Sequence, residues 1–158
     1  MEQSHINGAT LVLIGQGSEK TALQQQADTL NLRNVRFPGA VDYDNLPRCY
    51  ASADVFVIPS LEDNWSLVVP EAMSCGLPVL TSKYNGCWPE LVHPDRNGWV
   101  FNPLDTNDLF QCLQQCLKHR VRLPEMGQHS KDIVSGFTPQ TAATSILRAI
   151  QIAIESRN

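Results

Sequence analysis

The stretch LEDNWSLVVPEAMSCGLPVL, residues 61–80, joins a polar loop, a short helical pattern and the start of a strand. A strand-like run, DVFVIP (54–59), stands directly before it, and PVLTS (78–82) closes it. The run DVFVIP does not alternate polar with apolar residues, which is typical of a parallel strand covered on both faces. Pro70 fits only the first turn of a helix, and Gly76 is a natural helix stop. The stretch therefore predicts a strand–loop–helix–strand unit of a parallel sheet.

Short apolar runs alternate with helical patterns on both sides of that unit. Further strands are predicted at 10–15, 35–39 and 98–101, and further helices at 18–32, 43–53, 105–119, 123–134 and 138–155. Ser18, Asp105 and Thr138 are placed to cap three of these helices. The alternation predicts an α/β fold, with a Rossmann-like parallel sheet flanked by helices.

The chain is long enough for one ordinary domain. We expect a single domain over its 158 residues, with a leader at 1–9, an α/β core at 10–104 that carries the site, and C-terminal helices at 105–158. The net charge is −4 and no basic run occurs, which argues against nucleic acid as a partner. No apolar run approaches the length that spans a membrane.

Five cysteines are scattered without a disulfide or zinc pattern, which is typical of reduced thiols in a cytoplasmic protein. We expect no metal site. Cys87 follows Gly86 in a predicted loop, and it is the one thiol that we predict to be reactive.

The segment GQGSEKT (15–21) lies where the first predicted strand meets its helix. A phosphate-binding P-loop and a dinucleotide fingerprint would each need a glycine where Lys20 stands. Both motifs therefore fail by one residue. We interpret the segment as a tight turn, whose backbone a ligand could still approach.

Glu71 stands about one turn into the helix that follows the polar loop. The free N–H groups of Ser66, Leu67 and Val68 at this helix start favour an anion such as a diphosphate. A carboxylate beside an anion would repel it, so Glu71 at this position requires another role. Because a carboxylate only accepts hydrogen bonds, it is well suited to bind paired hydroxyl groups. Spacing alone equally favours the alternative that Glu71 is a solvent-facing residue on a surface helix.

Four segments occur in a fixed order: LVLIGQGSEKTAL, NVRFPGAVDYDNLPRCYASADVFVIPS, DNWSLVVPEAMSCGLPVLTS and NGCWPELVHPDRNGWVFNPLDTNDL. From about Leu11 to Phe101 this series resembles the nucleotide-sugar-binding half of retaining glycosyltransferases of family four. These enzymes have the two-domain GT-B architecture. The third segment falls where the family has Glu-x7-Glu followed by Ala-x3-Gly-x-Pro-Val.

The resemblance implies roles for three acidic residues in the catalytic site. Glu71 matches the glutamate that holds the ribose hydroxyls of the donor nucleotide. Asp63 stands where the family has the glutamate beside the donor sugar, and Glu62 precedes it. Because aspartate is one methylene shorter, either Asp63 reaches less far or Glu62 takes its place, and the sugar specificity is open.

The resemblance also implies a set of donor-binding backbone positions, namely Gly15, Gly17, Gly39, Val41, Ser66, Leu67 and Val68. Gly15 and Gly17 let the chain pass close to the donor, and Gly39 and Val41 border the base. The amides of Ser66, Leu67 and Val68 bind the diphosphate.

The family has a strand–helix unit before residue 10 that carries a basic pair for the diphosphate, and the chain lacks it. The acceptor-binding domain is also absent. We therefore expect a truncated product or a fragment of a larger enzyme. The absent strand would lie between the strands at 11–14 and 54–58. These two strands then pair directly, or receive a strand from another chain, or keep unpaired edges.

The resemblance implies transfer of a sugar from a nucleotide-diphosphate donor, with retention of configuration, to an unknown glycan, lipid or small-molecule acceptor, as in polysaccharide biosynthesis. No cofactor or metal is expected. The protein would be cytoplasmic, with a membrane contact only through the acceptor domain. The alternative is an inactive nucleotide-binding or assembly module that needs a partner chain. A Rossmann oxidoreductase is disfavoured because the third glycine and an acid after the strand at 35–37 are lacking.

Overall fold

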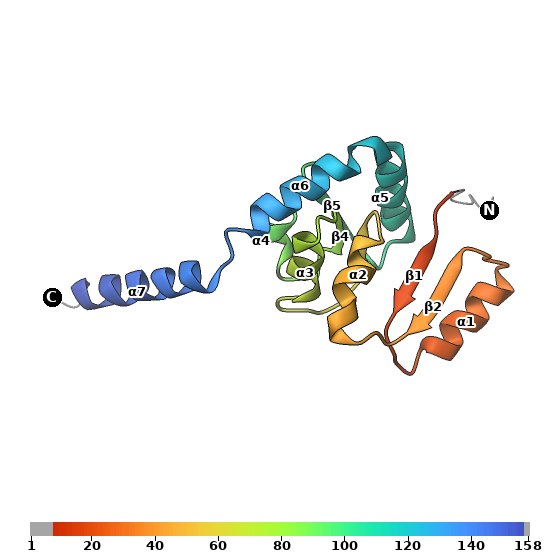
Figure 1. Ribbon diagram of the computed structural model, residues 1–158, viewed down its shortest axis with the longest axis horizontal. Helices are drawn as coiled ribbons and strands as arrows, with labels where there is room; N and C mark the ends of the chain where they lie inside the picture. Colours follow the sequence, from red (N-terminus) through yellow and green to blue (C-terminus); the bar gives the residue numbers. More distant parts are fainter. Residues whose placement is uncertain (1–7, 157–158) are drawn as a thin grey trace. The chain divides into compact units, whose positions relative to one another are not determined.

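The computed structural model describes residues 8–156 and divides into two compact units, the first ending at Leu46 and the second beginning at Pro47 (Figure 1). The strands form two separate parallel sheets, one in each unit. The predicted α/β fold with parallel strands is confirmed. The single domain over 1–158 stays a prediction, and most of the predicted leader lies outside the described residues.

The first unit is a two-stranded sheet with one helix. β1 (Leu11–Ile14) pairs in parallel with β2 (Val35–Gly39), and the connection between them contains α1 (Lys20–Thr29) (Figure 1). A 3-10 turn, η1 (Tyr43–Asn45), follows. The predicted cap at Ser18 is wrong, because Glu19 is the N-cap residue and the Ser18 hydroxyl donates to the Glu19 carboxylate at 3.3 Å.

The second unit is a three-stranded sheet with helices around it. Its elements are α2 (Leu46–Ala51, whose first residue still belongs to the first unit), β3 (Phe56–Ile58), α3 (Val68–Ser74), β4 (Val79–Ser82), α4 (Trp88–Leu91), β5 (Gly98–Phe101), α5 (Thr106–Lys118), η2 (Arg120–Arg122), α6 (Leu123–Val134) and α7 (Pro139–Glu155). The strand order is β3-β4-β5, so β4 is central. All four residues of β4 are buried, as expected for a parallel strand covered on both faces.

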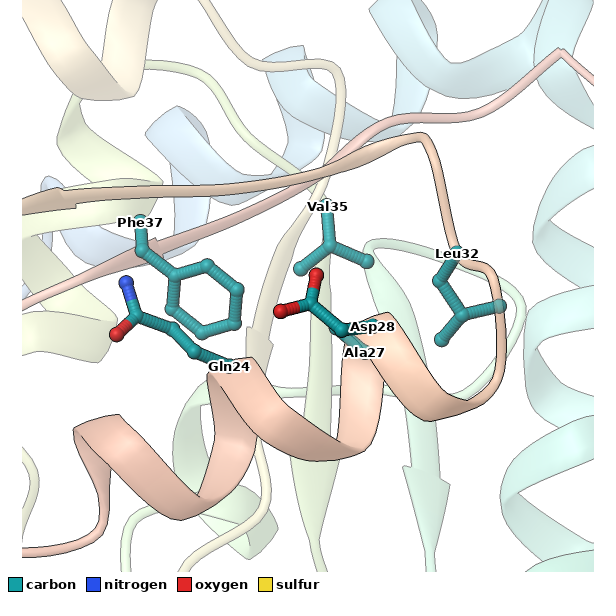
Figure 2. Close-up of a pocket in the computed structure, with 6 residues that line it drawn as sticks. All are labelled: Gln24, Ala27, Asp28, Leu32, Val35 and Phe37. Carbon is teal, nitrogen blue, oxygen red and sulfur yellow. The ribbon is translucent and has the colours of Figure 1, made fainter.

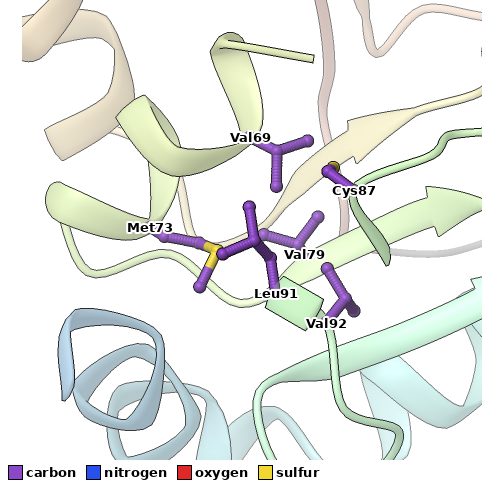
Figure 3. Close-up of a cluster of buried hydrophobic side chains, with 6 residues drawn as sticks. All are labelled: Val69, Met73, Val79, Cys87, Leu91 and Val92. Carbon is purple, nitrogen blue, oxygen red and sulfur yellow. The ribbon is translucent and has the colours of Figure 1, made fainter. Parts of the chain in front are cut away.

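Successive residues of β4 anchor two hydrophobic clusters on opposite faces of the sheet. Val79 belongs to a cluster with Val69, Met73, Cys87, Leu91 and Val92, drawn in Figure 3. Leu80 belongs to a cluster with Trp99, Phe101, Cys116 and Met126. The alternation follows from the two-residue period of a strand. The first cluster fixes α3 on the sheet through two of its side chains, Val69 and Met73.

A pair of glycines brings α6 against the end of α3. A Cβ atom added at Gly127 of α6 would lie 2.0 Å from the carbonyl oxygen of Gly76. Gly76 has φ +85°, the left-handed conformation that ends a helix with glycine. The sequence predicts this stop correctly, but the close contact with Gly127 depends on the tertiary fold.

The helices at the end of the chain begin where the sequence predicts. The Asp105 carboxylate accepts from the backbone N–H of Asn107 at 2.9 Å, and the Thr138 hydroxyl accepts from that of Thr141 at 3.1 Å. Both predicted caps are confirmed. No residue of α7 is buried. Within residues 8–156, no helix has the length and apolar character needed to cross a membrane.

Candidate functional site

The loops that follow β3 and β4 are joined at the carboxyl end of the second sheet. The Gly86 N–H donates to the carbonyl oxygen of Asp63 at 2.7 Å. A Cβ atom at Gly86 would lie 2.3 Å from the Asn64 carbonyl oxygen, so only glycine allows this approach. Ligands of parallel α/β sheets bind at this end of the strands.

The Asp63 carboxylate stabilises the loop in which it lies. One carboxylate oxygen accepts from the Trp65 N–H at 3.1 Å, and the other accepts from the Ser66 hydroxyl. The side-chain amide of the fully buried Asn85 donates to the same Ser66 hydroxyl at 2.9 Å. Both oxygens of Asp63 are thus already engaged within the protein. Glu62, directly before it, is exposed.

Cys87 is buried under this pair of loops, and its predicted reactivity is wrong. Its thiol donates to the Asn85 side-chain oxygen at 3.0 Å. Burial raises the pKa of the Cys87 thiol, although the nearby backbone N–H of Ser66 opposes the rise. The thiolate is the reactive form, so this environment makes Cys87 inert. Its place after Gly86 suggested exposure, but the loop folds back over it.

The start of α3 leaves backbone donors free. The helix begins at Val68, the last of the three residues predicted to lie at its start. Across the described part of the chain, no backbone carbonyl accepts a hydrogen bond from the N–H groups of Leu67 and Val68. The Ser66 N–H instead lies near the Cys87 sulfur. Leu67 and Val68 are therefore the two predicted diphosphate amides that remain available.

Glu71 projects from the first turn of α3 and is half-buried. Its neighbours Val69, Ala72 and Met73 are fully buried and fix the helix on the core. One carboxylate oxygen, Oε2, accepts from the Tyr50 hydroxyl at 3.1 Å. A carboxylate has about four acceptor positions, so Glu71 keeps the capacity to accept from further hydroxyl groups.

Two of the predicted glycines meet in the first unit. Gly15 has φ +139° and Gly39 has φ +89°, conformations that favour glycine. The Gly15 N–H donates to the Gly39 carbonyl oxygen at 2.9 Å, which joins the ends of β1 and β2. The Lys20 Nζ atom lies 3.7 Å from the position of a Cβ at Gly39. Gly17 and Val41 stand in the segments just beyond these strand ends.

The first unit also has an open hollow between α1 and β2, shown in Figure 2. Its lining consists of Gln24, Ala27, Asp28, Leu32, Val35 and Phe37. None of the predicted site residues belongs to this lining. The hollow is thus separate from the glycine turn at Gly15 and Gly39.

Sequence reasoning missed two side chains that hold the site together, Tyr50 and Asn85. They bond to Glu71 and Ser66, which lie 21 and 19 residues away along the chain. No local motif connects residues at such separations. Among residues 8–156, no group of three or more His, Cys, Asp or Glu side chains is placed to hold a metal ion.

Comparison with known proteins identifies relatives of the chain. The family profile described as Glycosyl transferases group 1 matches residues 1–119. The uncharacterized glycosyltransferase MJ1607 of Methanocaldococcus jannaschii is 36% identical over 151 residues, which cover 94% of this chain and 38% of that protein. The chain thus spans well under half the length of this relative.

Solved structures show the same fold. Anabaena Alr3699/HepE in complex with UDP-glucose is 26% identical, with a TM-score of 0.75 over 90% of this chain and 40% of that one. The C-terminal domain of LpcC, a glycosyl transferase group 1 family protein from Francisella tularensis, is 26% identical, with a TM-score of 0.70. That match covers 80% of this chain and 68% of the LpcC domain.

Proposed function

Since the chain belongs to the glycosyl transferases group 1 family and has the fold of the C-terminal domain of GT-B enzymes, we propose that it binds a nucleotide-diphosphate sugar as glycosyl donor. The observation that carries the proposal is Glu71. This residue matches the ribose-binding glutamate of the family, it is half-buried on a fixed helix, and its carboxylate can accept further hydrogen bonds. The complex of Alr3699/HepE with UDP-glucose supports the donor class.

The second unit contains candidate residues for binding the diphosphate and the sugar of the donor. The free N–H groups of Leu67 and Val68 would bind the diphosphate, with the amide of Ser66 as a third, weaker donor because it lies near the Cys87 sulfur. Asp63 and Glu62 are both candidates for the sugar, since Asp63 accepts two hydrogen bonds inside its loop but keeps further acceptor positions, and Glu62 is exposed. For the first unit, donor contacts by Gly15, Gly17, Gly39 and Val41 stay predictions.

The proposed reaction is transfer of the donor sugar, with retention of configuration, to an acceptor of unidentified class. The N–H groups at Leu67 and Val68 would stabilise the departing diphosphate through hydrogen bonds to its developing charge. They supply only part of that stabilisation, so transfer also requires acceptor-binding and basic groups beyond those assigned here. Because the chain covers a minor part of its relatives' length, we propose donor binding as the activity of this chain and transfer as that of a complete enzyme.

A second candidate function is a nucleotide-binding assembly module that works with a partner chain. The observation that favours it is the apolar strand β1, in which Leu11, Val12 and Ile14 are 50%, 50% and 42% exposed. Parallel strands of this composition are normally covered on both faces. Sugar transfer by the purified chain alone would exclude this alternative.

The test of donor binding is calorimetric titration of the purified chain with UDP, GDP and ADP. We expect saturable binding of at least one of them. Removing the Glu71 carboxylate removes charged hydrogen bonds that contribute about 1.5–3 kcal/mol each, so Glu71→Ala should weaken that binding by about tenfold or more.

The matched control is Glu125→Ala, because Glu125 also follows a proline in the first turn of a helix. We expect the control variant to bind as the wild type does. A folded chain that binds none of the three nucleotides would contradict the proposal, and so would equal binding by the Glu71→Ala variant.

A further inference from the structure

Tyr50 reaches the Glu71 carboxylate from a different helix. It stands near the end of α2, and its hydroxyl donates to Glu71 Oε2 at 3.1 Å. Its ring packs edge-on against Phe56 of β3, with ring centroids 5.7 Å apart and an interplanar angle of 74°. The ring is thus fixed on the sheet while its hydroxyl points at α3.

The environment keeps the Tyr50 hydroxyl protonated. Burial and the adjacent Glu71 carboxylate both raise the pKa of Tyr50 well above its usual value. A protonated phenol is a hydrogen-bond donor at every pH in the working range of an ordinary protein. Glu71 therefore has a permanent donor on one side of its carboxylate.

A glutamate side chain has several rotatable bonds, and ordering it costs conformational entropy. The bond from Tyr50 restricts this freedom before any ligand arrives. It occupies one acceptor position on Oε2 and leaves Oε1 without a partner among the described residues. A carboxylate held in this way is prepared to accept from two neighbouring hydroxyl groups.

We propose that Tyr50 is a positioning residue, which orients the Glu71 carboxylate toward the paired hydroxyls of the donor ribose. The inference rests on the proposed function, because Glu71 must contact the ribose for its orientation to affect binding. It differs from a purely structural role, in which the bond would only attach α2 to α3.

The experiment compares two probes that differ only in the hydroxyls at issue. The first is whichever of UDP, GDP and ADP binds best, and the second is its 2′,3′-dideoxy analogue. Calorimetric titration with both probes is carried out on the wild type, Tyr50→Phe, Glu71→Gln and the double variant. Tyr84→Phe is the matched control, because within the described residues the Tyr84 hydroxyl makes no hydrogen bond with Glu71.

The positioning role predicts an effect that depends on the ribose hydroxyls. Tyr50→Phe should weaken binding of the nucleoside diphosphate by about three- to tenfold. It should leave binding of the dideoxy analogue unchanged, and it should add nothing to the loss caused by Glu71→Gln. Tyr84→Phe should bind both probes as the wild type does.

Three results would overturn the inference, and they differ from one another. An equal loss with both probes would assign Tyr50 a structural role. A loss in Glu71→Gln with none in Tyr50→Phe would refute positioning while leaving the donor site intact. If the wild-type chain binds none of UDP, GDP and ADP, the proposed function fails and the inference fails with it.

Discussion

The helices α3 and α6 have the same pair of residues near their start, Pro70–Glu71 in one and Pro124–Glu125 in the other. In both, the proline lies in the first turn, where its missing N–H has little cost. The two glutamates nevertheless have different surroundings. Glu125 is exposed and lies 3.8 Å from Arg122 in an ion pair on the surface, whereas Glu71 is half-buried and accepts from Tyr50.

This difference separates what a helix start needs from what a binding site needs. A carboxylate in a first turn interacts favourably with the helix dipole wherever the helix lies in the fold. Only Glu71 bonds to a residue distant in the chain, Tyr50, and only α3 follows a loop anchored to its neighbour through Asp63 and Asn85. The local sequence forms the helix, and the tertiary contacts form the candidate site.

The largest effect should come from the contact that joins the two helices. In Gly127→Ala, the new methyl group would meet the backbone oxygen of Gly76, which no rotamer change can move. We expect a loss of about 3 kcal/mol in the free energy of unfolding, measured by urea denaturation of the full chain. At Gly136 an added Cβ has an ordinary contact at 3.5 Å, so Gly136→Ala is the control and should cost much less. Equal stability of Gly127→Ala and wild type would contradict the described packing of α6 on α3.

A smaller effect should come from Asn85, which has no counterpart near Glu125. Its side chain bonds to Ser66 and Cys87, and all three residues are buried. Asn85→Ala leaves buried polar groups without partners, which should cost about 2 kcal/mol in the free energy of unfolding. It should also weaken nucleotide binding, because the loop before α3 loses its anchor.

Asn64→Ala is the control for that variant, since Asn64 is exposed on the same loop. We expect nearly wild-type stability and binding there. Full stability of the Asn85→Ala variant would show that the loop before α3 does not depend on this network.

The smallest effect should appear in the stability of the two glutamate variants themselves. Glu71→Gln and Glu125→Gln each remove a favourable interaction with a helix dipole, with an expected cost of about 0.3–1 kcal/mol. Urea denaturation of both variants, at one pH and salt concentration, checks this. A much larger loss in Glu71→Gln would assign Glu71 to the stability of the fold, and the comparison between the helices would then not report on binding.

The elements that depend on local sequence were predictable. Asp105 and Thr138 cap their helices as expected, because capping joins residues a few positions apart. The run DVFVIP (54–59) predicted a strand covered on both faces, and β3 forms there, but its three residues are only partly buried. Ser18 failed as a cap because its neighbour Glu19 takes that position. The four-residue α4 was missed, since so short a segment has no periodic pattern.

The contacts that build the candidate site were not predictable in the same way. Glu71 and the amides after Trp65 were proposed as site residues from their spacing and from the resemblance to a family. The partners of that site, Tyr50 and Asn85, come from other elements, and no spacing rule connects them to it. The reading of Cys87 as reactive failed for the same reason, because its burial depends on a loop that folds back onto Asp63.

The most direct test of the central claim is a crystal structure of the chain bound to the best-binding nucleoside diphosphate. We predict that both ribose hydroxyls lie within hydrogen-bond distance of the Glu71 carboxylate, with the Tyr50 hydroxyl still bonded to Oε2. A ribose bound away from α3, with Glu71 facing solvent, would contradict the account.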